Sequence, residues 1–161
     1  MEQRELKKIK TRRRFWMNVI TDFNERRQEK KLLTERKMLK DLPIRKLKNM
    51  IDEWFNPFFQ KRFHKTAMEE ECVHSAIESF LLGAAYSRFG YYGESMEQAN
   101  TRCIQEEQEL INNLFDNILY LARESNDDFV MESIYLTCQH FIHYWWEEGF
   151  LAGKKRYKLK L

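Results

Sequence analysis

The sequence has few of the residues that build turns and cross-links. Its 161 residues include 5 glycines, 2 prolines and 3 cysteines. Because sheet proteins need frequent turns, this scarcity of glycine and proline argues against a β-rich fold. The cysteines, Cys72, Cys103 and Cys138, are odd in number and form no CxxC pair. This pattern argues against a disulfide framework and favours reduced thiols buried as small hydrophobic groups.

Long hydrophobic runs are also missing. No stretch approaches the roughly 18 consecutive apolar residues of a membrane span, and the first residues lack the apolar segment of a signal peptide. We therefore expect a soluble, cytoplasmic protein with no transmembrane segment.

Charge is plentiful, at 33% of all residues, and it is unevenly distributed along the chain. Residues 1–48 contain 17 Lys and Arg against 7 Asp and Glu, whereas residues 67–148 contain 3 against 16. Residues 149–161 add 5 basic residues and no acidic one. A net charge of +3 thus conceals a basic arm, an acidic body and a basic tail. This asymmetry indicates an anionic partner, or chain ends that fold back on the body.

Apolar residues recur at steps of three and four along most of the chain, which is typical of amphipathic helices. We predict an all-α fold: a single-domain bundle of about five helices with a basic N-terminal helical arm. The predicted division is a basic helical arm over residues 1–38 and a bundle domain over residues 39–161.

Helix starts are indicated by local signals. Pro43 predicts the start of a short second helix that ends near Asn56-Pro57. Capping-box spacings at Thr66–Glu69 and Ser95–Gln98 predict the starts of a third helix and of one long fourth helix. The polar segment Ser125–Asp128 predicts the start of a last helix, which we expect to continue past the glycine at position 149.

The third predicted helix is apolar on almost every side from Ile77 onward, which indicates a central, buried position. The small residues Gly83-Ala84-Ala85 would let a neighbouring helix approach closely. The string Phe89–Gly93 then interrupts the pattern, with two glycines that can adopt positive φ. In the last helix, adjacent positions diverge by about 100°, so only one of Trp145 and Trp146 is expected to face fully inward.

Three strings resemble a known family. Ile77–Gly83, Phe89–Met96 and the closing Trp145–Phe150 segment resemble the YbaK-type family of Bacillus and related bacteria, domain of unknown function 2521. The resemblance covers roughly residues 39–161. It supports the all-helical prediction and implies the cytoplasm of a Gram-positive bacterium. It implies no activity, cofactor or catalytic residue.

A metal site is one alternative. Glu71 and His74 have the Glu-x-x-His spacing of di-iron helical bundles, although such bundles use two of these motifs and the chain has one. The full set of candidate ligands for a metal-binding bundle enzyme is Glu71, His74, Glu78, Glu107 and His143. The structural alternative is that these side chains are solvated or paired. Cysteine–histidine catalysis is disfavoured because Cys138 and His140, two residues apart on a helix, point in different directions.

Two surfaces are candidates for binding a partner. The first is a corner with exposed aromatics: Gly90, Tyr91, Tyr92, Gly93, Glu94 and Trp146. The second is the basic arm, which mixes cations with an aromatic residue: Lys7, Lys8, Lys10, Arg12, Arg13, Arg14 and Trp16. The arm, over residues 1–20, could contact an anionic polymer or membrane surface. The alternative is that the corner packs on the core and the arm packs on the body or a second copy.

Taken together, the sequence favours a non-catalytic protein-interaction module, with no cofactor, that binds an unidentified protein or associates with itself. The metal-binding enzyme and an arm that binds nucleic acid or anionic membranes are the two alternatives.

Overall fold

A computed structural model describes residues 23–58, 62–122 and 128–160. The chain falls into two units, divided between Lys37 and Met38. In the first unit, the described residues, 23–37, are helical. This agrees with the helix predicted for the arm.

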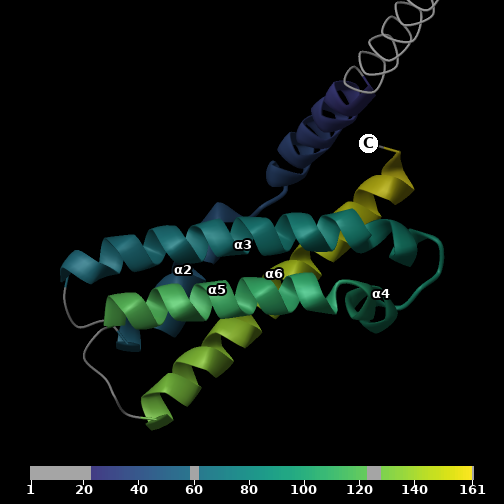
Figure 1. The fold of residues 1–161 in the computed structure, drawn as a ribbon. Helices are drawn as coiled ribbons and strands as arrows, with labels where there is room; N and C mark the ends of the chain where they lie inside the picture. The colour runs from purple at the N-terminus through teal and green to yellow at the C-terminus, as the bar shows by residue number, and fades with distance from the viewer. Residues whose placement is uncertain (1–22, 59–61, 123–127, 161) are drawn as a thin grey trace, which may run out of the picture. The chain divides into compact units, whose positions relative to one another are not determined.

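The second unit is all-helical within the described residues, as predicted (Figure 1). Its elements, in chain order, are α2 (Ile44–Phe55), the short 3₁₀ helix η1 (Asn56–Phe58), α3 (Arg62–Tyr91), α4 (Met96–Arg102), α5 (Ile104–Ala122) and α6 (Asp128–Leu159). At 1.5 Å per residue, α3 and α6 are each about 45 Å long. Figure 1 shows α3 and α5 running alongside each other while α6 crosses them obliquely.

Two of the predicted starts are confirmed. Pro43 occupies the N-cap position of α2, where its missing N–H costs no helical hydrogen bond. Ser95 caps α4 in a complete capping box: its hydroxyl accepts from the Gln98 N–H, and the Gln98 side chain accepts from the Ser95 N–H.

Two other predictions about helix boundaries are wrong. α3 already begins at Arg62, so Thr66 lies inside the helix and does not cap it. The long helix predicted from Ser95 is broken at Cys103, whose φ of −118° and ψ of 21° are not helical. The segment is therefore two helices, α4 and α5, and Cys103 is the joint between them.

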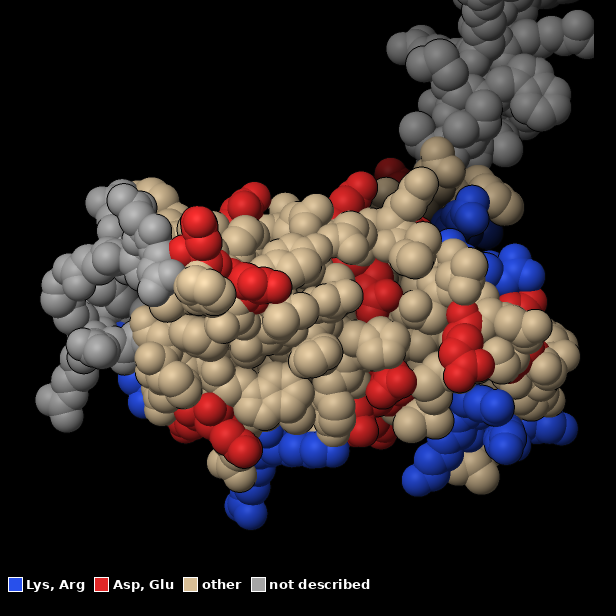
Figure 2. Space-filling model, turned by 90° about the horizontal axis from the view of Figure 1, so that it is seen from below, with Lys and Arg blue, Asp and Glu red and all other residues tan. Residues whose placement is uncertain are grey.

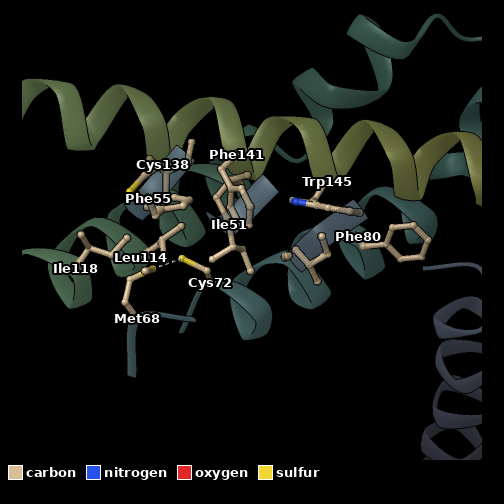
Figure 3. Close-up of a cluster of buried hydrophobic side chains, with 14 of the residues drawn as sticks. Ile51, Phe55, Met68, Cys72, Phe80, Leu114, Ile118, Cys138, Phe141 and Trp145 are labelled. Atoms are coloured by element: carbon tan, nitrogen blue, oxygen red, sulfur yellow. Dashed lines mark hydrogen bonds between the residues drawn. The ribbon is translucent and has the colours of Figure 1, made fainter. Parts of the chain in front are cut away.

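The main core lies where α2, α3, α5 and α6 meet (Figure 3). Phe55 packs edge-to-face on Phe141, with ring centroids 5.1 Å apart. Cys72 and Cys138 lie among these side chains without solvent exposure, and the Cys72 thiol contacts the Met68 sulfur at 3.7 Å. The cysteines are free and buried, as the sequence predicted.

α3 and α6 cross so closely that their backbones touch. A Cβ on Gly83 would overlap the Trp146 carbonyl oxygen, and one on Gly149 would overlap the Phe80 carbonyl oxygen. The buried Ser79 hydroxyl donates to the Ile142 carbonyl across the same crossing, at 2.6 Å. The close approach predicted at Gly83 is confirmed, and its partner is Gly149. We refer to this crossing, Gly83 and Gly149 with Phe80 and Trp146, as the glycine seam.

Candidate functional site

The five candidate metal ligands fall into two separate groups. The first group is Glu107 and His143. Glu107 is 6% exposed, accepts one hydrogen bond of 2.8 Å from Asn100 Nδ2 and is hydrogen-bonded to His143 Nδ1, also at 2.8 Å. Here Glu107 joins α5 to both α4 and α6. The neighbouring carboxylate raises the pKa of His143 above its usual value, more than partial burial lowers it.

The other three candidates line an open groove of about 710 Å³ between α3 and α5. Glu71 accepts a hydrogen bond of 2.8 Å from Asn117, and His74 lies 3.7 Å from Glu78. Asn117 is ten positions beyond Glu107 on α5, which corresponds to about 15 Å along the helix. Within the described residues, no group of three or more His, Cys, Asp and Glu side chains is arranged to hold a metal ion.

The thiols are poorly suited to nucleophilic chemistry. Burial raises the pKa of Cys138 to about 12 and that of Cys103 to about 11, and it raises the pKa of Cys72 as well. The hydrogen bond that the Cys103 sulfur accepts from the Trp146 indole, at 3.2 Å, lowers the pKa of Cys103 by less than burial raises it. These thiols therefore remain protonated near neutral pH.

The corner between α3 and α4 differs from the sequence-based expectation at its first glycine. Gly90 lies within α3, buried, and a Cβ there would overlap the ring of Phe150. Of the two glycines, it is Gly93 that has a positive φ, 108°, and no heavy atom lies near the position of its Cβ. The first glycine is thus required by packing and the second by the turn.

Both tyrosines of this corner are exposed, Tyr91 at 43% and Tyr92 at 81%. Tyr91 stacks on Tyr157 of α6, with ring centroids 5.7 Å apart, and meets Tyr92 edge-on at 5.2 Å. Tyr157 is itself 45% exposed. We call Tyr91, Tyr92 and Tyr157 the aromatic corner. Tyr157 is not among the residues predicted from the sequence because it lies 65 positions beyond Tyr92, and its one signal there is an aromatic side chain in a basic tail.

Charged residues brace the turn that follows the aromatic corner. Arg102 donates two hydrogen bonds to Glu94, of 2.9 and 2.7 Å, and its guanidinium lies 4.5 Å from the centre of the Phe89 ring. This bond lowers the pKa of Glu94. Glu94 therefore ties the loop to the end of α4.

Trp146 is not part of this surface. Both Trp145 and Trp146 are fully buried, so the expectation that only one faces inward is wrong. The reason is α4: Ala99 and Cys103 cover the side of α6 that carries Trp146, and Phe150 stacks on its ring at 5.2 Å. The short helix gives the second tryptophan a core of its own.

The basic arm candidates, residues 7–16, lie outside the described residues, so their role remains a prediction. On the face shown in Figure 2, Asp and Glu side chains are scattered across the surface, and several Lys and Arg side chains lie along its lower edge. Within the described part of the chain, no helix has the length and apolar character needed to cross a bilayer.

Comparison with known proteins places the chain in a family. Residues 17–161 match the family described as "Protein of unknown function (DUF2521)". The chain belongs to this family. The match begins at residue 17, so the family includes much of the arm that the resemblance had left out. "Uncharacterized protein YbaK" of Bacillus subtilis (strain 168) is 31% identical over 146 residues, covering 90% of this chain and 99% of the relative. No solved structure matches.

Proposed function

We propose that this protein is a non-catalytic protein-interaction module of the cytoplasm and that the aromatic corner is its contact surface. The observation that carries the proposal is the exposed, mutually stacked group of Tyr91, Tyr92 and Tyr157. Tyrosine is enriched in protein interfaces because it offers a large contact area and a hydroxyl while losing little conformational entropy on binding.

The support beneath the aromatic corner favours binding. Gly90 lets α3 lie against Phe150, and the positive φ of Gly93 turns the chain directly after Tyr92. The bidentate bond between Arg102 and Glu94 then holds the loop that follows. A surface fixed in this way loses less entropy when a partner binds, which leaves more of the contact energy for affinity.

The non-catalytic part of the proposal is supported by the reactive side chains. The pKa values of the three thiols are raised by burial, and Glu107 and His143 are hydrogen-bonded to each other. The cytoplasmic part is supported by the same cysteines, which are free and buried and so need no oxidising compartment.

The test is site-specific photocrosslinking in living cells. A benzophenone amino acid replaces Tyr92 in one strain and the exposed Glu109 of α5 in a control strain. We expect a discrete covalent adduct with another protein from position 92 and none of the same size from position 109. Absence of an adduct at position 92, or the same adduct at both positions, contradicts the proposal.

A further inference from the structure

Three basic residues lie one helical turn from a tyrosine of the aromatic corner. Arg88 lies one turn before Tyr91 on α3, and Lys154 lies one turn before Tyr157 on α6. Lys160 closes the last turn of α6, with its backbone N–H bonded to the Tyr157 carbonyl at 3.3 Å. Arg88 and Lys160 are exposed, and Lys154 is half-buried. We call Arg88, Lys154 and Lys160 the cationic rim.

Helix electrostatics explain why cations collect at this end. α3 ends at Tyr91 and α6 at Leu159, and Tyr91 stacks on Tyr157, so two helix C-termini come together here. Each terminus carries about half a negative charge, which stabilises nearby Lys and Arg. The same end of the molecule therefore presents positive side chains beside exposed aromatic rings.

The rim is not neutralised by acidic neighbours. Two acidic residues of adjoining segments are already paired: Glu94 with Arg102, and Asp41 with Arg156. Among the described residues, none of the three rim cations forms an ion pair. The contact made by Arg88 is with the ring of Phe89, 4.8 Å away. The positive charge of the rim is therefore available to a partner.

Outside the rim, the segment from residue 67 to residue 148 has the opposite sign. Residues 67–148 contain 16 Asp and Glu against 3 Lys and Arg, and the α3–α5 groove is lined by Glu70, Glu71, Glu78 and Asp116. An acidic partner is repelled by this surface and attracted by the rim. Charge complementarity of this kind selects partners and steers their approach.

We propose that the aromatic corner binds an acidic segment of another protein, with an apolar or aromatic side chain on the tyrosines and flanking carboxylates on the cationic rim. This inference rests on the proposed function and adds the chemical class of the partner. A protein segment is favoured over an anionic membrane because a short segment can contact the rim alone, whereas a broad anionic surface would also approach the acidic side chains of residues 67–148.

The experiment uses the full chain with the photocrosslinker at position 92. Two charge-reversal variants carry the same change in net charge. The first, R88E/K154E/K160E, reverses the rim, and the second, R45E/K48E/K65E, reverses three cations on α2 and at the start of α3. We expect the rim variant to lose adduct about tenfold and the control variant to keep it. The milder R88Q/K154Q/K160Q variant, checked for helicity by circular dichroism, should show an intermediate loss.

The outcomes separate the two proposals. If the unreversed chain gives no adduct at position 92, the proposed function itself fails. If the adduct forms and is unaffected by rim reversal, the function stands and the acidic partner is wrong. Mass spectrometry of the adduct should map a foreign segment rich in Asp and Glu. A crosslink to a second copy of this chain, or co-sedimentation of the protein with phosphatidylglycerol vesicles that is lost in the rim variant, overturns the inference.

Discussion

The glycine seam and the aromatic corner both depend on glycine, for opposite reasons. In the seam, Gly83 and Gly149 leave no space for a methyl group, because each faces a backbone carbonyl of the other helix. At the corner, Gly93 has open space around it and is required by its positive φ alone. The seam is therefore determined by packing between distant segments, and the corner turn by local backbone geometry. The glycine seam contributes to the stability of the fold, and the corner turn positions the exposed tyrosines.

The seam should be the more sensitive of the two regions. We expect Gly149→Ala to lower the free energy of unfolding by about 3 kcal/mol, because the added methyl overlaps the Phe80 carbonyl and forces two long helices apart. Urea denaturation followed by circular dichroism measures this. A loss below about 1 kcal/mol would mean that the helices can separate cheaply, and the contrast with the corner would disappear.

Glu107, the buried carboxylate that joins α4, α5 and α6, should give the second largest loss of stability when mutated. We expect Glu107→Ala to cost about 2 kcal/mol, because it removes the acceptor for both Asn100 and His143. The same denaturation experiment on Glu109→Ala, two positions away and exposed, is the control and should change stability by less than about 0.5 kcal/mol. Equal losses in the two variants would contradict the role assigned to Glu107.

A substitution in the corner turn should lower the stability by less than either of these two. We expect Gly93→Ala to destabilise the protein by about 1 kcal/mol, since an alanine must adopt a φ of 108° but meets no neighbouring atom. Thermal unfolding of Gly93→Ala beside Gly149→Ala compares the two kinds of glycine directly. If Gly93→Ala is the more damaging, the turn and not the seam limits stability.

The Glu107–His143 pair predicts a pH dependence. Because Glu107 raises the pKa of His143 in the folded protein, the pair stabilises the fold fully below the unfolded histidine pKa of about 6.5. This contribution is lost as the pH rises through the higher, folded pKa. Stability measured from pH 5.5 to pH 9 should show this loss in the natural chain and lack it in His143→Gln. If the natural chain instead gains stability over this pH range relative to His143→Gln, the predicted direction of the pH dependence is wrong.

The smallest effect on stability should come from the surface of the corner. We expect Tyr92→Ala to change the free energy of unfolding by less than about 0.5 kcal/mol, because the side chain is 81% exposed. The crosslink at position 92 identifies the partner. The amount of that partner that co-purifies with the Tyr92→Ala chain should nevertheless be lower than the amount that co-purifies with the natural chain. A variant that loses stability but still binds would assign Tyr92 to the fold.

Some features of the fold follow directly from local sequence. The capping box at Ser95 was predictable because its partners are three residues apart, and Pro43 marked the start of α2 because proline fits only the first positions of a helix. The same reasoning failed at Thr66, where α3 had already begun at Arg62. A capping spacing shows that a residue is able to cap, and the neighbouring residues decide whether it does.

The candidate sites were harder to predict because each joins segments far apart in the chain. Glu107 and His143 were both singled out, but their pairing, and their separation from Glu71 and His74, depend on how α5 lies against α3 and α6. Tyr157 was missed for the same reason, since only the stack on Tyr91 gives it a role.

By itself, the sequence determined the helical class, the burial of the cysteines and the glycine of the corner turn, because periodicity, hydrophobicity and backbone freedom are local properties. The tertiary structure alone decided the break at Cys103, the burial of both Trp145 and Trp146, and the meeting of Tyr91 with Tyr157. Each of these depends on which faces of distant helices meet, and helix packing is set by the fit of whole surfaces.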